Sequence, residues 1–317
     1  MNRLTIAYAN HRPETIRLSE TIMREHQAVI LEEPPDDNLS AMLNGRMGID
    51  DYLLGQEIEY PAFSAEQCRL LRKLHRDGIS IIQVEPYYQH LFTVQNFFAD
   101  GHGPGELDQS TEQYLVYSHE KMVTGKLIDY YKAVQTRDFE HIIESIQTFT
   151  GADAARFRLR DQLRARSIAG HCSEHARICI EAGPMHLLLY RYLRDYLPEG
   201  WTVRPVFVEN KILEKIGGRS ALYGPGDTLT AHYLLGNALS KEYRNLLAAR
   251  ALIFTKINEK EELDDWQTDF PHLHTESAIN QIVKQLSYEQ CRTLFSEIGE
   301  VPAEKAFHLV RNFTIYF

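Results

Sequence analysis

Two histidines and three glutamates of this 317-residue chain lie at or just after the ends of short apolar segments. His11 comes after LTIAYA, Glu32 and Glu33 after AVIL, Glu85 after ISIIQV, and His186 shortly after RICIE. Imidazole nitrogens and carboxylate oxygens are together typical ligands of zinc, manganese or cobalt. We therefore predict a divalent metal site with a water molecule in its open position. The predicted ligands are His11, Glu32, Glu33 and His186.

Two features of this predicted site concern the glutamates. Neighbouring residues of a strand point to opposite faces of the sheet, so only one of Glu32 and Glu33 is expected to face the ion. A bound ion lowers the pKa of its water towards about 7, and Glu85 is the candidate base that takes the proton.

The apolar segments alternate with stretches of helical periodicity, and this alternation predicts the fold. Short hydrophobic strands separated by helices form a mostly parallel sheet covered by helices on both faces, so we predict an α/β fold. In such folds the ligand lies at the carboxyl ends of the strands, where the histidines and glutamates fall. The expected strands are residues 4–9, 28–31, 79–84, 177–181, 201–208 and 251–255.

The middle of the chain is helical in pattern, and we predict a helical insertion or cap at about residues 100–170 within a single α/β domain spanning 1–317. Helices of residues 100–155 are expected to cover the site. The glycine-rich loop DGHGPG at 100–105 would be their hinge, because glycine permits large changes of backbone dihedral.

The order of these motifs resembles the superfamily of the TraB and PrgY pheromone-shutdown proteins, the Tiki metalloproteases, the ChaN haem-binding lipoproteins and the erythromycin esterases. The matching stretches are YANH at 8–11, VILEE at 29–33, RD at 160–161 and GPMH at 183–186, and the resemblance covers residues 3–195. Tyr8 stands where the family has glycine, so only the histidine of the first GxxH motif is retained. The resemblance implies a metal-dependent hydrolase of peptide or ester bonds. It also implies that Arg160 stabilises an oxyanion or binds a substrate carboxylate.

Other interpretations remain open. A ChaN-like protein would bind haem or another small molecule without turnover, and the altered motif at Tyr8 favours a regulatory protein that keeps the fold without the chemistry. The segment HCSEH at 171–175 has the spacing of a zinc-binding helix, but the adjacent strand leaves little room for one, and we predict a helix end and a loop there. Tyr87, Tyr88 and Trp266 are expected either to line a pocket or to pack in the core.

Composition limits the partners and the compartment. The 44 acidic and 34 basic residues give a net charge of −10, which disfavours non-specific binding to nucleic acid. No apolar run approaches the roughly 18–20 residues that cross a bilayer. Cys68, Cys172, Cys179 and Cys291 show no CxxC spacing. We expect a cytoplasmic protein that acts on a small-molecule or peptide substrate and has no nucleic-acid or membrane partner.

Overall fold

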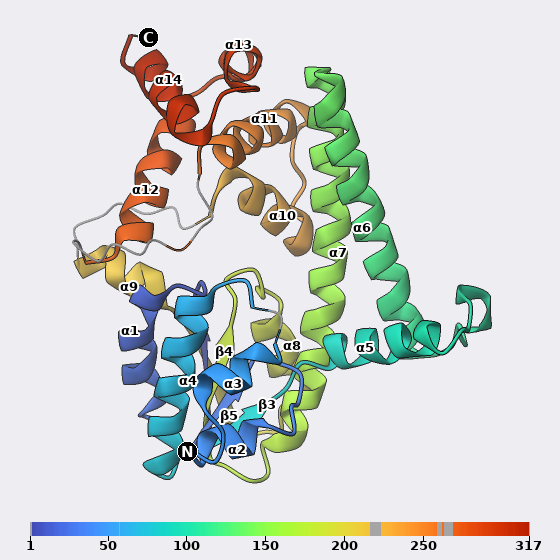
Figure 1. The fold of residues 1–317 in the computed structure, drawn as a ribbon, viewed down its shortest axis with the longest axis vertical. Coiled ribbons are helices and arrows are strands. Elements are labelled where there is room, and N and C mark those ends of the chain that lie inside the picture. Colours follow the sequence, from blue (N-terminus) through green and yellow to red (C-terminus); the bar gives the residue numbers. More distant parts are fainter. Residues whose placement is uncertain (1, 57, 216–222, 259–261, 263–268, 317) are drawn as a thin grey trace. The chain divides into compact units, whose positions relative to one another are not determined.

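The computed structural model describes residues 2–56, 58–215, 223–258, 262 and 269–316 (Figure 1). Its contacts cluster in two compact units. Unit 1 comprises Met1–Tyr117 and Arg158–Ile212, and unit 2 comprises Ser118–Phe157 and Leu213–Phe317. Each unit is a group of residues that contact one another, and such a group need not fold on its own. The single domain expected for residues 1–317 therefore stays a prediction.

Unit 1 contains a five-stranded parallel sheet, and the chain has the α/β fold that the sequence predicts. The strands are β1 (Asn2–Tyr8), β2 (Ala28–Leu31), β3 (Ser80–Gln83), β4 (Arg177–Ala182) and β5 (Trp201–Phe207). Their order across the sheet is β3-β2-β4-β1-β5, so β4, which is distant in sequence, lies between β1 and β2. The prediction that these segments share one sheet is confirmed.

Helices of unit 1 begin where the sequence supplies a start signal. Proline is favoured in the first turn of a helix, because its missing N–H would have no partner there and its fixed φ suits the helix. Pro13, Pro61 and Pro86 occupy this position in three helices. The helices that begin in this unit are α1 (Pro13–Met23), α2 (Leu39–Leu43), α3 (Ile49–Leu54), α4 (Pro61–Arg76), α5 (Pro86–Ala99), the 3-10 helix η1 (Pro104–Glu106), α6 (Glu112–Thr136), α8 (Leu189–Tyr196) and α9 (Val208–Lys215).

Side chains of the strands alternate between the two faces of the sheet. On one face Leu4, Ile6 and Tyr8 of β1 join a buried core with Ala165 and Ile168 of α7 (Phe139–His171). The same core contains Leu189 and Leu193 of α8. On the other face a ring nitrogen of His26, just after α1, lies 2.8 Å from the hydroxyl of Thr5. Gln67 of α4 bonds Glu181 of β4 on that face as well, and Figure 1 shows α1 and α4 alongside the strands.

Unit 2 is helical throughout its described residues. It contains most of α6, the first half of α7, α10 (Pro225–Leu235), α11 (Lys241–Ile257), α12 (Pro271–Val283), α13 (Tyr288–Ile298) and α14 (Ala303–Tyr316). The strand predicted at 251–255 is wrong, because these residues lie inside α11. A short apolar run has the same pattern in a buried strand and in a buried helix, and Ile253 and Ile257 repeat at helical spacing in the core of this unit.

Two further expectations concern α7 and its neighbour. Helices α6 and α7 account for most of the insertion predicted at 100–170, whereas their placement over the site stays a prediction. Helix α7 ends at His171 and a turn follows, so the HCSEH segment is a helix end, as expected. Among the described helices, none combines the length and the apolar character that a bilayer crossing needs.

The sheet core is tested by truncating one leucine in unit 1. Leu4 is fully buried in β1, so Leu4→Ala should lower the free energy of unfolding by about 2–5 kcal/mol through lost burial and the cavity left behind. The matched control is Leu54→Ala at the end of α3, where the side chain is 85% exposed and the change should stay within about 0.5 kcal/mol. Urea unfolding followed by circular dichroism measures both, and equal effects would contradict the packing described.

Candidate functional site

The carboxyl ends of all five strands lie at one edge of the sheet. Tyr8, the last residue of β1, pairs with Ala182 of β4 and Phe207 of β5, and Leu31 of β2 pairs with Gln83 of β3. The residues that follow these ends therefore start from the same edge. They are His11, Glu32, Glu33, Glu85, the turn of residues 183–186, and Glu209.

His186 lies between two carboxylates. Its Nε2 is 2.6 Å from Oε1 of Glu32, and its Nδ1 is 2.5 Å from Oδ1 of Asp161 on α7. The other oxygen of Asp161 accepts the backbone N–H of Leu188 at 2.9 Å, which holds the turn before α8. Burial alone would lower the pKa of His186, but the charges and hydrogen bonds of Glu32 and Asp161 raise it to about 9. The side chain is therefore an imidazolium at neutral pH, with both N–H groups donated to carboxylates.

Two arginines of α7 lie one turn apart and complete this network. The Nη2 atom of Arg160 donates to Oε1 of Glu32 at 3.0 Å and to Oε2 of Glu85 at 3.1 Å. The guanidinium of Arg164 is fully buried and donates to the backbone carbonyls of Val84 at 3.0 Å and Glu181 at 2.7 Å. Residues four apart on a helix share a face, so α7 presents both cations to the strand ends.

We call these six side chains the charge network: Glu32, Glu85, Asp161, Arg160, Arg164 and His186. Three are acidic and three basic, so the network is neutral when every member is ionised. Burial would raise the pKa of Glu32, but the charges of His186, Arg164 and Arg160 bring it well below its usual range. The Glu32 carboxylate also accepts the backbone N–H of Gly183 at 2.6 Å. Both of its oxygens are therefore engaged.

Two of the four predicted metal ligands, His186 and Glu32, do not fit a metal site in this arrangement. A metal takes lone pairs from neutral imidazole or from carboxylate, and the charge network uses those of His186 and Glu32 for protein hydrogen bonds. Within the described part of the chain, no group of three or more His, Cys, Asp or Glu side chains is arranged to hold an ion. Glu85, the predicted base, is fully buried against Arg160.

His11 lies outside the charge network and faces a small cavity. Its ring stacks on Phe63 of α4 with the centroids 4.9 Å apart, and among the described residues no hydrogen bond engages its ring nitrogens. Burial lowers its pKa, and the nearby charge of Glu32 offsets part of that effect. The cavity has a volume of about 220 Å³, and we call it the reaction cavity. Its walls are His11, Glu32, Glu33, Ile58, Glu59, Tyr60, Phe63, Ser64, Gln67 and Glu181.

Glu181 is a site residue that sequence reasoning missed. It lies on β4, is almost fully buried, and accepts a hydrogen bond from the amide of Gln67 at 2.6 Å. Burial, together with the charges of Glu33 and Glu32, raises its pKa to about 8. A glutamate inside an otherwise apolar strand segment was the available signal. Arg164, four residues after Arg160 on one helix face, was a second signal.

Glu209 also escaped prediction. It is buried at the start of α9, directly after β5, and its carboxylate accepts the backbone N–H of Asn10. It thereby anchors the segment that carries His11. Glu209 lies two residues after the end of β5, just as Glu33 lies two residues after the end of β2. This spacing was the signal in the sequence that could have identified it.

The predicted site residues thus separate into two groups. Glu32, Glu85, Arg160 and His186 meet in the charge network, whereas His11, Glu32 and Glu33 line the reaction cavity. Both Glu32 and Glu33 line that cavity, and Glu32 also belongs to the charge network, so which of them would face an ion stays a prediction. They follow the last residue of β2 in a bend, where the alternation of strand faces no longer applies.

The three aromatic residues expected near a pocket have different places. The guanidinium of Arg160 lies over the ring of Tyr88 at 4.8 Å and near that of Tyr87 at 5.8 Å. Such contacts favour a desolvated cation. Trp266 lies outside the described residues.

Comparison with known proteins gives one relative to report. The chain is 29% identical over 293 residues to an uncharacterized protein of Archaeoglobus fulgidus, an alignment that covers 92% of this chain and 97% of the relative. No protein-family model and no solved structure matches the chain. The resemblance to the TraB, Tiki, ChaN and erythromycin esterase superfamily therefore stays a prediction.

The imidazolium of His186 makes folding stability depend on pH in a defined window. Because its pKa rises from 6.5 to about 9 on folding, its contribution is complete below pH 6.5 and is lost as the pH passes through about 9. The pKa of Glu181 also rises on folding, from 4.5 to about 8, so this group causes a further loss of folding stability between pH 4.5 and 8. The comparison is therefore made in a Glu181→Gln background. There, His186→Gln should abolish the loss between pH 6.5 and 9. It should also destabilise the chain at pH 6 by about 3–5 kcal/mol, since it leaves buried carboxylates unpaired.

Calorimetric unfolding across this pH range measures the effect. His102→Gln is the matched control, because that side chain is 48% exposed and lies outside the charge network. It should leave the slope unchanged. A His186→Gln variant whose stability falls between pH 6.5 and 9 as steeply as its parent's would contradict the assignment of the charge.

Proposed function

We propose that the chain is a hydrolase of peptide or ester bonds whose acid–base chemistry takes place in the reaction cavity. One observation carries the proposal: the same cavity is lined by an imidazole whose ring nitrogens are not engaged by described residues and by a buried carboxyl, Glu181. The pKa of His11 is lowered and that of Glu181 is raised to about 8. Opposite shifts of two neighbouring groups are typical of an acid and a base that work together near neutral pH.

Each group has a role in this scheme. Neutral His11 takes a proton from a water molecule as the water oxygen attacks the substrate carbonyl. The Glu181 carboxyl gives its proton to the leaving nitrogen or oxygen as the bond to the carbonyl carbon breaks. The resulting imidazolium and carboxylate exchange protons with solvent, which restores the starting state.

The charge network supports this chemistry through Glu32. The Glu32 carboxylate lines the reaction cavity and raises the pKa of His11 relative to burial alone, so it stabilises the imidazolium that forms. Arg160, Arg164 and Gly183 hold Glu32 in place. We assign Arg160 to positioning Glu32, and its contact with a substrate oxyanion stays a prediction. The metal dependence implied by the resemblance is not part of this proposal, because His186 and Glu32, two of the predicted ligands, do not fit an ion.

The rate of hydrolysis should have a bell-shaped pH dependence. Activity should rise as His11 loses its proton, below pH 6.5, and fall as Glu181 loses its proton, near pH 8. Measurement of kcat/KM with ethyl butyrate between pH 5 and 10, from the butyrate released, gives both limbs, because its alkoxide leaving group needs a proton. His11→Ala should reduce kcat/KM by about 10²–10⁴-fold, and Glu181→Gln should remove the alkaline limb.

The control for these variants is Glu66→Gln on α4, a half-exposed glutamate that pairs with Arg69 at the surface. It should retain the parent profile. A His11→Ala variant with unchanged kcat/KM and an unchanged acid limb would rule out His11 as the base.

Metal removal provides a separate test. Dialysis against a chelator should leave both the activity towards p-nitrophenyl butyrate and the melting temperature unchanged, because His186 is protonated on both ring nitrogens and Glu32 is bonded through both oxygens. Elemental analysis before and after dialysis accompanies the assay. A loss of activity that zinc, manganese or cobalt restores would instead support the metal-dependent hydrolase implied by the resemblance.

A further inference from the structure

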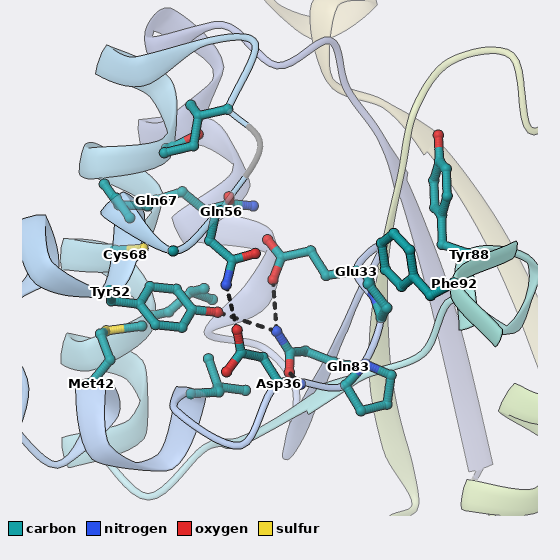
Figure 2. A pocket seen from close by; sticks show the side chains of 18 of the residues that line it. Glu33, Asp36, Met42, Tyr52, Gln56, Gln67, Cys68, Gln83, Tyr88 and Phe92 are labelled. Atoms are coloured by element: carbon teal, nitrogen blue, oxygen red, sulfur yellow. Dashed lines mark hydrogen bonds between the residues drawn. The ribbon is translucent and has the colours of Figure 1, made fainter. Parts of the chain in front are cut away.

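A larger pocket adjoins the reaction cavity. Its volume is about 590 Å³, within the range of about 300–1,000 Å³ that is typical of small-molecule sites. It shares Glu33, Ile58, Ser64 and Gln67 with the reaction cavity, so the two lie side by side. Figure 2 shows Glu33 and Gln83 in this pocket with Tyr52 to one side and Phe92 and Tyr88 to the other. We call it the substrate pocket.

The charge of the two cavities is of one sign. Among the described residues that line them, the carboxyl groups are Glu32, Glu33, Asp36, Glu59 and Glu181, and no lysine or arginine is present. An anionic ligand would find no lysine or arginine among these described residues to pair with. The lining therefore favours a neutral or cationic ligand.

Two of these carboxylates differ from those of the charge network. Glu32, Glu85 and Asp161 each pair with a cation, whereas within the described chain no Lys, Arg or His forms an ion pair with Glu33 or Asp36. Their partners are neutral amide groups. The Gln83 amide donates to Oε2 of Glu33 at 2.9 Å, and the amide of Gln56 donates to Asp36 (Figure 2).

Gln83 also links Glu33 to the backbone of Asp36. Its side-chain oxygen accepts the backbone N–H of Asp36 at 2.8 Å, while its nitrogen faces Glu33 and the hydroxyl of Tyr52. The pocket thus holds the carboxyl groups of Glu33 and Asp36, and among the described residues no cationic side chain is bonded to either. Burial raises the pKa of Glu33, and a bound cation would favour its ionised form.

Aromatic and apolar groups complete the lining. The rings of Tyr88 and Phe92 are 6.3 Å apart and nearly parallel, and Phe92 is 46% exposed at the pocket. An exposed ring face attracts an ammonium group. Leu39, Met42 and Leu71 offer an apolar surface to the rest of a ligand.

We propose that the substrate pocket binds the ammonium group of an amine-bearing substrate, with Glu33 and Asp36 as its anionic partners and Phe92 as its aromatic one. This inference rests on the proposed function for the reaction, since the bond to be hydrolysed would lie in the adjoining reaction cavity. It adds the substrate class: esters or amides that carry a free amine close to the scissile carbonyl.

Isothermal titration calorimetry with leucinamide in a His11→Ala background, which lacks the proposed base, tests binding independently of turnover. The aliphatic side chain of this probe suits the apolar lining, and N-acetylleucinamide is the same molecule without the positive charge. We expect leucinamide to bind, and Glu33→Gln to weaken its binding by about tenfold or more, because a charge-assisted hydrogen bond is replaced by a neutral one. N-acetylleucinamide should bind more weakly by a similar factor. Glu66→Gln, an acid-to-amide change on the exposed side of α4, should leave the binding of leucinamide unchanged.

The possible outcomes separate the two proposals. No binding of leucinamide, or equal binding of the acetylated probe, overturns the ammonium site even if p-nitrophenyl butyrate is hydrolysed. Binding of leucinamide without hydrolysis of leucine p-nitroanilide or p-nitrophenyl butyrate supports the ammonium site and contradicts the proposed function. If Glu33→Gln does not fold, Asp36→Asn at a half-exposed position provides the same test. It should also weaken the binding of leucinamide.

Discussion

The ion pair between Glu32 and His186 is the interaction on which the site depends. It joins the end of β2 to the turn after β4, and through Asp161 and Arg160 it attaches α7 to both. Buried charges are tolerated only when every member is paired, because an unpaired one retains the full loss of hydration. The six groups of the charge network are therefore interdependent. They fix the carboxyl edge of the sheet as one rigid surface within unit 1.

Rigid placement of Glu32 leaves two neighbours in contrasting states. His11 is buried against Phe63 with no carboxylate bonded to its ring among the described residues, so its neutral form is favoured. Glu181 is buried on β4 near the negative charges of Glu33 and Glu32, so its protonated form is favoured. One charge network thus supplies the field in which a base and an acid coexist. The physical origin of both states is burial, acting on groups of opposite charge type.

The metal site predicted from the sequence and the charge network of the structure draw on the same residue types. Histidines and glutamates at strand ends suit a divalent ion, and the same types also suit a network of buried ion pairs. Arg160 and Asp161 favour the network of ion pairs, because they reach the strand ends from α7, where Arg160 donates to Glu32 and Asp161 accepts an N–H of His186. The resemblance placed an arginine and an aspartate on this helix, but their effect on His186 required the tertiary contacts.

By itself the sequence determined the strands of the sheet and the edge at which the site lies. Short apolar segments that end in His, Glu or Gly can be recognised from neighbouring residues in the sequence. Parallel pairing of the strands then brings their carboxyl ends together. It did not determine that residues 251–255 are helical, because a short buried run has no distinguishing period. Nor did it determine the charge of His186 or the proton on Glu181. These are set by which charges lie within a few ångströms and by how much water is excluded, and only the tertiary structure decides either quantity.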